Sequence, residues 1–203
     1  MNKSALGVFF KIPAPGKVKK RLAVEIGEDS ALKAYKSMLK ATIKNISVLQ
    51  GIDIYGFYDG ILKDNTFMKI FPLIPQEGRD LGERMSNAIT LLLNSGYKKV
   101  SLIGADSPDL PVSFIKEAFI KLDSFDLVIG PSEDGGYYLI GMNKPFDDIF
   151  KNIKWGYNNV FKDTISIANN AGIRYFLLSG WYDIDDNTHF KKWKDSIAYP
   201  EAI

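Results

Sequence analysis

Short apolar runs rich in β-branched residues alternate with segments whose apolar residues recur at helical spacing along this chain of 203 residues. The apolar runs predict strands, and the helical spacing predicts helices between them. The predicted strands are 5–12, 52–58, 67–71, 99–104, 127–130, 137–142 and 173–178. The predicted helices are 29–49, 81–94, 112–122, 159–170 and 188–197. The second helix has a clear start signal, because Asp80 is a suitable N-cap with Glu83 three residues later.

These predicted strands are apolar along their whole length, and helices separate them in the sequence. Such a pattern is typical of a mostly parallel sheet that helices cover on both faces. We therefore predict a three-layer α/β/α architecture. No repeat or linker divides the chain, and a domain averages roughly 150 residues, so we expect one domain over residues 1–203. Ligands of such sheets bind beyond the carboxyl ends of the strands, where the strand order reverses. Candidate chemistry should follow Ile12, Tyr58, Gly104 and Leu178.

The composition excludes several classes of site. The chain has no cysteine, which excludes a thiol nucleophile, a disulfide framework, zinc held by cysteine and iron–sulfur clusters. Its one histidine, His189, excludes metal sites built from several histidines. With 26 basic and 24 acidic residues the formal net charge is only +2, whereas nucleic-acid binders usually carry a larger surplus. We expect no nucleic-acid partner.

Neither a signal peptide nor a membrane span is apparent. The first apolar run is short and ends at Lys11 without a small-residue cleavage site. No stretch approaches the ~18 consecutive apolar residues of a membrane span. We expect a soluble, cytoplasmic protein without membrane contact, and the sequence gives no indication of its oligomeric state.

The segment KIPAPGKVKKRLA (11–23) concentrates basic side chains directly after the first predicted strand. If a helical turn begins after Gly16, its cations share one face while Val18 and Leu22 pack inward. Cations on a loop that leads into a helix form a suitable cradle for a phosphate chain. The alternative is a solvated basic loop, and the GxxxxGK[ST] and GxGxxG spacings are absent. The five cations are Lys11, Lys17, Lys19, Lys20 and Arg21.

The segment SLIGADSPDLP (101–111) places carboxylates at the end of an apolar strand. Mg²⁺ usually takes one or two protein carboxylates together with phosphate oxygens and water. We assign Asp106 to such an ion and Asp109 to capping of the next helix, although either carboxylate could serve as a cap.

The segment GPSEDGGYYLIG (130–141) contains an Asp-Gly-Gly turn signal, which by itself predicts a hairpin. Two glycines, a carboxylate and two tyrosines also suit close approach of a hydroxylated substrate. Asp134 could then orient an acceptor or act as its base.

The segment WYDIDDNTHF (181–190) brings together Asp183, Asp185 and Asp186. Three carboxylates are costly to place side by side without a positive charge among them. A cation shared with Asp106 would supply that charge. The alternative is an acidic loop in which Asp186 or Asn187 caps the last helix, with His189 as a packing or surface residue.

Five segments in the same order resemble a bacterial family of small GT-A-like transferases, over about residues 10–190. Its members are known as arsenosugar-biosynthesis, or radical-SAM/selenodomain-associated, glycosyltransferases. They are distant relatives of the 2-phospho-lactate and molybdopterin guanylyltransferases. The segments are KIPAPGKVKKRLA, QEGRDLGERM, LIGADSPDLP, LVIGPSEDGGYYLIGM and DIDD.

The resemblance implies a GT-A, nucleotide-diphospho-sugar-transferase fold with Mg²⁺ or Mn²⁺ as cofactor. It implies metal ligation by Asp106 and Asp185, and catalytic roles for Asp106 and Asp134. Phosphate-binding and substrate-binding positions also follow by match to the family's motifs. The phosphate-binding positions are Lys11, Lys17, Lys19 and Arg21. The substrate-binding positions are Gly135, Gly136, Tyr138 and Trp155.

The chain departs from the family pattern at three places. The DTPED-like segment that starts at Asp185 lacks its Thr, Pro and final Asp. Lys20 replaces a usual threonine, and Gly156-Tyr157 stands where Ser-Thr is usual. The change in the DTPED-like segment concerns the second metal ligand, Asp185. The change at Gly156-Tyr157 concerns contacts with the acceptor.

Two reactions fit this architecture. In glycosyl transfer from a nucleotide sugar, the metal and the cations neutralise a departing nucleoside diphosphate; in nucleotidyl transfer, they bind a triphosphate and pyrophosphate leaves. The number of cations favours a triphosphate, whereas the resemblance favours a nucleotide-sugar donor and a small-molecule acceptor. We predict a metal-dependent glycosyltransferase, with nucleotidyl transfer as the alternative. A nucleotide-binding protein without catalysis is the third hypothesis.

Overall fold

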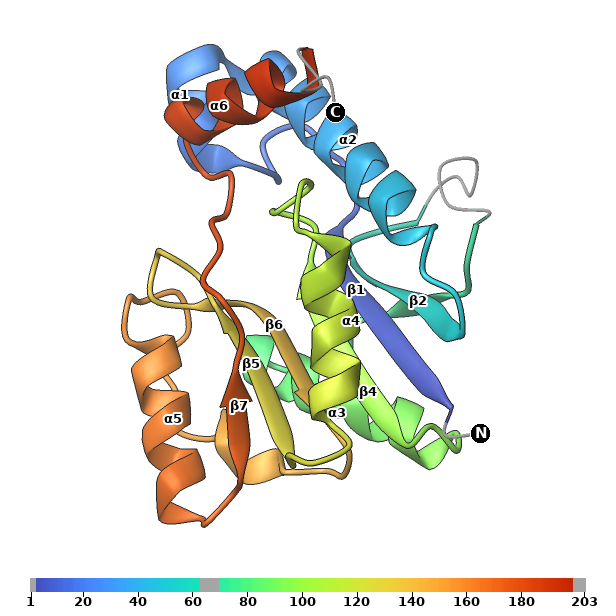
Figure 1. The fold of residues 1–203 in the computed structure, drawn as a ribbon. Coiled ribbons are helices and arrows are strands. Elements are labelled where there is room, and N and C mark those ends of the chain that lie inside the picture. The colour runs from blue at the N-terminus through green and yellow to red at the C-terminus, as the bar shows by residue number, and fades with distance from the viewer. Residues whose placement is uncertain (1–2, 63–69, 199–203) are drawn as a thin grey trace.

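One sheet runs through the computed structural model, which describes residues 3–62 and 70–198 (Figure 1). Its strand order over these residues is β3-β2-β1-β4-β6-β5-β7. All neighbouring strands pair in parallel except β6, which is antiparallel to both β4 and β5. The strands are β1 (Ser4–Lys11), β2 (Ile52–Asp59), β3 (Leu73–Pro75), β4 (Lys99–Gly104), β5 (Leu127–Pro131), β6 (Tyr137–Met142) and β7 (Tyr175–Leu177).

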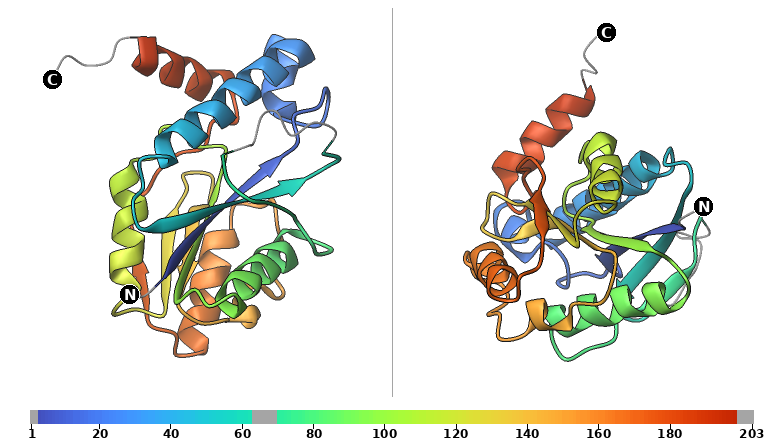
Figure 2. Two further views of the ribbon diagram at one scale, coloured as in Figure 1. Left: turned by 90° about the vertical axis from the view of Figure 1, so that its right-hand side faces the viewer. Right: turned by 60° about the horizontal axis from the view of Figure 1, so that its bottom comes forward.

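Helices cover both faces of the sheet, which confirms the predicted three-layer α/β/α architecture. Helices α3 and α5 and the short 3₁₀ helix η1 pack on one face, and α2 and α4 on the other (Figure 2). Helices α1 and α6 lie together against the first half of α2 (Figure 1). None of the helices in the described ranges is both long and apolar enough to cross a membrane. The helices are α1 (Lys20–Ile26), α2 (Glu28–Ile46), α3 (Leu81–Asn94), α4 (Val112–Lys121), η1 (Asp147–Phe150), α5 (Val160–Asn170) and α6 (Asn187–Ala198).

The central strands are apolar on both faces because each face is covered. In β1, Ala5 packs with α3 and its neighbour Leu6 packs with α4, and both side chains are fully buried. Successive side chains of a strand point to opposite faces, so this pattern places β1 in the interior of the sheet. Since β1 pairs with β2 on one side and β4 on the other, the strand order reverses between β1 and β4.

Three features differ from the predicted elements. The predicted strand 67–71 is wrong where it can be compared: Ile70 and Phe71 lie in a turn and a bend, and residues 67–69 are outside the described range. The third strand instead follows Pro72, as Leu73–Pro75 pairs with Gly56–Tyr58 of β2. Helix α1 begins at Lys20 after an irregular turn, and η1 is too short to show helical periodicity.

The start of α3 follows the predicted capping pattern. The Asp80 carboxylate accepts a hydrogen bond of 2.9 Å from the backbone N–H of Glu83. This contact satisfies one of the N–H groups left free at a helix N-terminus. Helix α3 also supplies residues that line the pocket described below, so the cap fixes one wall of the candidate site.

We expect Asp80→Ala to lower the free energy of unfolding by about 1 kcal/mol, because the cap hydrogen bond is lost. Urea denaturation measures this change. Asp80→Asn is the matched control, since asparagine caps about as well as aspartate and should retain most of the stability. Equal losses in the two variants would contradict a capping role for this side chain.

Candidate functional site

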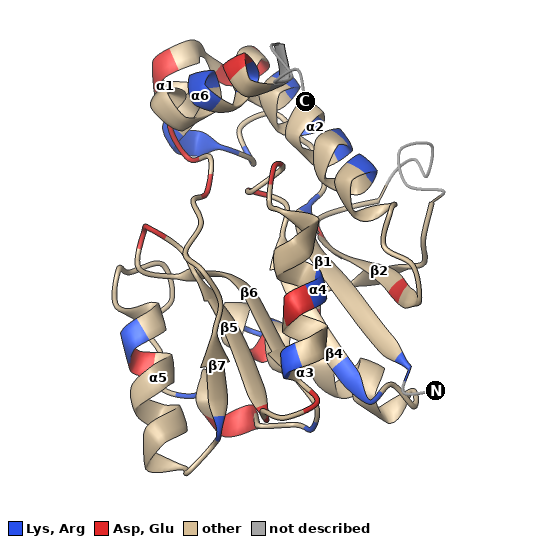
Figure 3. Cartoon of the chain, in the orientation of Figure 1, with Lys and Arg blue, Asp and Glu red and all other residues tan. Residues whose placement is uncertain are grey.

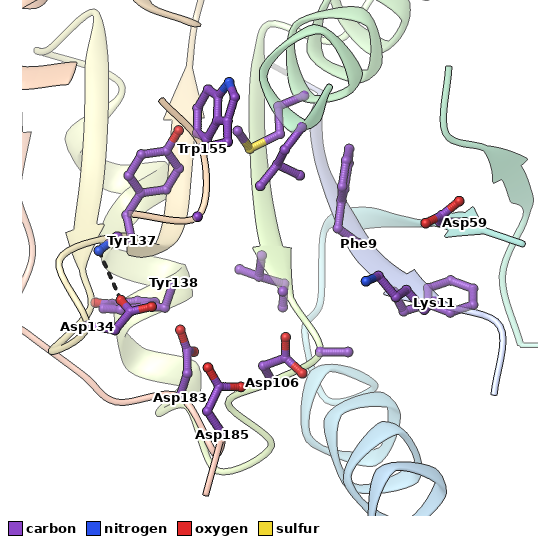
Figure 4. Close-up of a pocket in the computed structure, with 18 of the residues that line it drawn as sticks. Phe9, Lys11, Asp59, Asp106, Asp134, Tyr137, Tyr138, Trp155, Asp183 and Asp185 are labelled. Carbon is purple, nitrogen blue, oxygen red and sulfur yellow. Dashed lines mark hydrogen bonds between the residues drawn. The ribbon is translucent and has the colours of Figure 1, made fainter. Parts of the chain in front are cut away.

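A pocket of about 960 Å³ opens at the carboxyl edge of the sheet, where β1 and β4 end side by side (Figure 4). This is the point where the strand order reverses, as expected for a ligand site in an open α/β sheet. The segment 11–21, the end of β4, the β5–β6 hairpin and the segment 183–185 all contribute to its walls. The basic loop before α1 faces the acidic segments that follow β4 and precede α6 (Figure 3).

Lys19 joins two of these segments through a buried ammonium group. Its Nζ lies 2.7 Å from Oδ1 of Asp106 and 3.1 Å from Oδ1 of Asp185. It also donates a 2.5 Å hydrogen bond to the backbone carbonyl of Ile184. The Lys19 side chain is only 4% exposed, whereas the two carboxylates are 49% and 42% exposed. The positive charge that the acidic cluster requires is thus supplied by the protein itself.

The charges around Lys19 determine its protonation. Burial by itself would lower the pKa of Lys19, but the charges of Asp106 and Asp185 and their hydrogen bonds outweigh burial and raise the pKa above its usual value. Lys19 is therefore a permanent cation. Arg21 adds a weaker contact, 3.6 Å from Asp185, and its side chain is 77% exposed. An exposed pair of this kind contributes little to stability.

The local backbone directs Lys19 into the site. Lys19 has φ 45° and ψ 49°, the left-handed region that a non-glycine residue adopts rarely. Val18 and Leu22 are buried on either side of it, as the sequence pattern predicted. These anchors hold the loop while the Lys19 side chain turns toward the carboxylates.

The end of β1 is fixed by a tyrosine that the sequence analysis did not identify. Tyr35 of α2 accepts a hydrogen bond from the backbone N–H of Lys11 at 2.9 Å and donates one to its carbonyl at 3.1 Å. Burial raises the pKa of Tyr35, and the charge of Asp106 raises it further. The phenol therefore stays protonated and holds Lys11 at the mouth of the pocket.

Asp183 is held by two serine hydroxyl groups. Ser107 donates to its Oδ1, and Ser132 donates to its Oδ2 at 3.0 Å. Burial raises the pKa of Asp183 to about 6, and repulsion from Asp106 and Asp134 adds to the shift, while the serine hydrogen bonds oppose it. This role of Asp183 has no local sequence signal, because its serine partners lie 76 and 51 residues away.

The segment around Asp134 is a hairpin turn, as the Asp-Gly-Gly signal indicates, and it also lines the pocket. Oδ1 of Asp134 accepts a 2.9 Å hydrogen bond from the backbone N–H of Gly136. Gly135 has φ +88°, and a side chain there would overlap the carbonyl oxygen of Asn158. The glycine allows the hairpin to pack against the segment that follows Trp155, so both lie on the same wall.

Aromatic rings form the rest of this wall. Trp155 packs edge to face against Tyr137, with ring centroids 6.5 Å apart. Gly82 of α3 makes room for its indole, because a Cβ at that position would lie 2.6 Å from the ring. Tyr138 is buried, and its hydroxyl donates to the carbonyl of Ser179 at 2.8 Å. Tyr138 therefore offers the pocket its ring rather than its hydroxyl hydrogen.

The end of β2 contributes polar groups that the sequence analysis missed. Gln76 donates from its side-chain nitrogen to the carbonyl oxygens of Phe10 and Phe57, at 3.3 and 3.0 Å. Arg84 lies 3.2 Å from the carboxylate of Asp59. Gln76 directly follows β3, and Arg84 lies in the first turn of α3.

The predicted site residues are brought together, with one exception. Gly135 does not line the pocket and instead packs its backbone against Asn158. The other ten all line it: Lys11, Lys17, Lys19, Arg21, Asp106, Asp134, Gly136, Tyr138, Trp155 and Asp185.

The prediction that Asp109 caps the helix after β4 is wrong. The N-cap of α4 is Pro111, without a side-chain hydrogen bond. The Asp109 carboxylate instead accepts hydrogen bonds from Tyr182 and, at 3.4 Å, from the indole of Trp181. In the last helix Asp186 is the cap, since it accepts a 2.9 Å hydrogen bond from the N–H of His189.

The oxygens around Lys19 suit a divalent cation. Two carboxylate oxygens and one carbonyl oxygen converge on a single cation position. Oxygen ligands of this kind are those that Mg²⁺ prefers. Within residues 3–62 and 70–198, no group of three or more Asp, Glu, His or Cys side chains could hold an ion. Because only two carboxylates converge here, the site fits an ion that completes its coordination with water and phosphate oxygens.

We expect the stability contributed by Asp183 to fall as the pH rises from about 4 to about 6. In this window the folded chain keeps a proton that the unfolded chain releases at its usual pKa of 3.8. Asp183→Asn removes this dependence, so its stability relative to the wild type should increase by about 3 kcal/mol across the window. Urea denaturation at several pH values measures the difference, and a pH-independent difference would contradict the raised pKa.

Comparison with solved structures places the fold among nucleotide-diphospho-sugar transferases. A protein from Desulfovibrio desulfuricans G20, provisionally assigned as such a transferase, is 30% identical over 98% of this chain and 96% of its own, with a TM-score of 0.88. The structure of CMP:2-keto-3-deoxy-manno-octonic acid synthetase with CTP has a TM-score of 0.60 at 10% identity, covering 98% of this chain and all of that chain. Rv0371C from Mycobacterium tuberculosis H37Rv, in complex with manganese, has a TM-score of 0.52 at 11% identity, covering 94% of this chain and 97% of its own.

Sequence comparison identifies the family. No curated protein shows significant similarity to the chain. A family model described as "Uncharacterized protein conserved in bacteria (DUF2064)" matches residues 42–157, which include the end of β4 and the β5–β6 hairpin. This match spans more than half of the chain, and the protein therefore belongs to the DUF2064 family.

Proposed function

We propose that this protein is a metal-dependent glycosyltransferase that uses a nucleotide-sugar donor and a small acceptor bearing a hydroxyl or amine. In this proposal, residues 1–203 act as one GT-A-like domain in the cytoplasm. The family and the fold support a transferase that uses nucleotides. The motif resemblance to radical-SAM-associated glycosyltransferases supports the narrower choice of reaction.

The charge distribution across the pocket carries the proposal. The Lys and Arg side chains that line it come from the segment 11–21 and from α3, among the described residues. The opposite wall, built from the β5–β6 hairpin and residues 155–158, presents the carboxylate of Asp134 and the rings of Trp155 and Tyr157. Asp183 lies near both Asp134 and Asp106. One side of the pocket thus suits phosphates, and the other suits a hydroxylated acceptor.

This asymmetry matches the requirements of glycosyl transfer. Negative charge develops on the departing nucleoside diphosphate, where Lys17, Lys20 and Arg21 can bind it. The attacking hydroxyl or amine loses a proton, which Asp134 is positioned to accept on the other wall. A carboxylate also stabilises the positive charge that develops on the sugar carbon as the leaving group departs.

The divalent cofactor belongs at the junction of the two walls. Asp106 and Asp185 would hold Mg²⁺ or Mn²⁺, with the carbonyl of Ile184 nearby. When bound, such an ion neutralises the leaving phosphates and orients them. The fold relative in complex with manganese supports a divalent ion in this architecture.

Nucleotidyl transfer is the second candidate, and two observations favour it. A fold relative is complexed with CTP, and the basic segment carries more cations than a diphosphate needs. Transfer to a phosphorylated acceptor, however, would bring an anion against Asp134. That repulsion favours an uncharged or cationic acceptor. A nucleotide-binding protein without catalysis is the third candidate, suggested by the incomplete DTPED-like segment.

Paired acceptors test the proposal directly. The protein is incubated with Mg²⁺ or Mn²⁺, a panel of nucleotide sugars, and alcohols or amines, each beside its phosphate ester. We expect nucleoside diphosphate to be released faster with the neutral or amine acceptor than with the ester. Release of pyrophosphate from a nucleoside triphosphate, stimulated by a phosphorylated acceptor, would replace glycosyl transfer with nucleotidyl transfer.

Asp106→Asn is the inactive control for this assay. Weakening a carboxylate ligand of the ion that neutralises the leaving phosphates should reduce turnover by ~10²–10³-fold while the protein remains folded. If neither pyrophosphate nor nucleoside diphosphate is released by the wild type, but a nucleotide raises its melting temperature, the non-catalytic hypothesis is correct.

Removing two charges of the basic loop should weaken nucleotide binding. We expect Lys17→Ala combined with Arg21→Ala to raise the dissociation constant by about tenfold at low ionic strength, and by less at high salt, because exposed charges are screened. Calorimetric titration with Mg²⁺-nucleotide measures this change. Lys36→Ala combined with Lys44→Ala is the matched control, since both side chains are exposed on α2 and lie outside the pocket. Equal effects of the two pairs would mean that only net charge matters.

A further inference from the structure

We infer that Lys19 is a resident cation which the divalent ion must displace, so that metal ion and nucleotide phosphate enter the site together. The inference deepens the proposed function and rests on it only in taking a divalent ion as part of the site. It concerns the order and coupling of binding, which neither the fold nor the charge pattern by itself determines.

The first observation is that the ammonium and the ion require the same oxygens. Nζ of Lys19 contacts Oδ1 of Asp106, Oδ1 of Asp185 and the carbonyl of Ile184. Oxygen ligands lie at about 2.0–2.6 Å from Mg²⁺ or Ca²⁺, which is closer than these ammonium contacts. An ion that takes both carboxylates would therefore stand where the ammonium stands, and two cations cannot share that position.

The second observation is the backbone conformation of Lys19. Its left-handed φ and ψ are unfavourable for a side chain with a Cβ atom. The buried side chains of Val18 and Leu22 hold the loop in this conformation. The contact with the carboxylates is therefore built into the loop, unlike that of an exposed lysine that pairs with a nearby acid.

A displaced ammonium needs another anion. The Lys19 side chain is 4% exposed, and a buried charge without a partner is strongly unfavourable. Lys17, Lys20 and Arg21 of the same loop line the pocket, so a phosphate bound there brings negative charge to the loop. The flexible four-carbon stem of lysine allows the ammonium to turn from the carboxylates to that phosphate.

Coupled binding follows from this exchange. Without nucleotide, the divalent ion has to expel Lys19 and leave it unpaired, so metal binding is weak. With nucleotide, the phosphate receives Lys19 and the metal takes the carboxylates. Because coupling between two ligands is reciprocal, the metal should strengthen nucleotide binding by the same factor.

Metal titration without nucleotide tests the exchange. Free Mn²⁺ is followed by electron paramagnetic resonance as it binds to wild-type protein, to Lys19→Met and to Lys17→Met. We expect Lys19→Met to bind Mn²⁺ at least tenfold more tightly than the wild type, because the competing charge is gone. Lys17→Met is the matched control, since Lys17 belongs to the same loop and, in the part of the chain that the structure describes, forms no ion pair with Asp106 or Asp185. The Mn²⁺ affinity of this variant should stay within about twofold of the wild type. Mn²⁺ affinity of Lys19→Met equal to or weaker than that of the wild type would overturn the inference.

Two further measurements keep the test decisive if Lys19→Met does not fold. Lys19→Arg keeps the positive charge and should bind Mn²⁺ as weakly as the wild type; a tenfold gain in this variant would overturn the inference. In the wild type, the side-chain ammonium resonance of Lys19 should be unchanged with Mg²⁺ alone and should shift when Mg²⁺ and a nucleoside diphosphate are both bound. A resonance unaffected by the two together would overturn it as well.

These outcomes are separate from those of the acceptor assay. The Mn²⁺ titration contains neither donor nor acceptor, so it gives the same answer for glycosyl and for nucleotidyl transfer. A gain in Mn²⁺ affinity without glycosyl transfer would overturn the proposed function and leave the exchange intact. Glycosyl transfer without such a gain would overturn the exchange and leave the proposed function intact.

Discussion

The contact of the Lys19 ammonium with Asp106 and Asp185 is the constraint on which the rest of the site depends. It ties the loop after β1 to the end of β4 and to the segment before α6, which are 87 and 166 residues away. Without a cation, Asp185 would repel Asp106, which follows β4, across a partly buried space. Helices α1 and α6, which adjoin the tied segments, lie together above the sheet edge.

The fold places the charges of the pocket by a simple geometric rule. Parallel strands bring their following loops to one edge, and the reversal of strand order between β1 and β4 opens a gap there. Strand β5 runs in the same direction as β4 and brings the chain to this edge, and the antiparallel strand β6 starts there, so the hairpin at Asp134 also lines the pocket. The separation of the basic wall from the wall that carries Asp134 is therefore a consequence of the strand order.

Much of this arrangement could be predicted from sequence because it depends on local signals. The apolar runs located six strands to within about two residues at each end, and the residues after β1 and β4 were found from strand-end position alone. Tyr35, Gln76 and Arg84 were missed because their partners are distant in sequence. Asp109 was assigned to a cap by its spacing from α4, but the aromatic hydrogen-bond donors of the last segment bind it instead.

Four of the carboxylates that line the pocket show why residue type alone does not determine a role. Asp106 and Asp185 share the buried ammonium of Lys19. Asp183 lies between two serine hydroxyls, and burial raises its pKa to about 6. Asp134 is oriented by a backbone N–H on the wall that carries the aromatic rings. The partners of these carboxylates, which are a buried ammonium, two hydroxyls or a backbone N–H, therefore distinguish side chains of one residue type within one pocket.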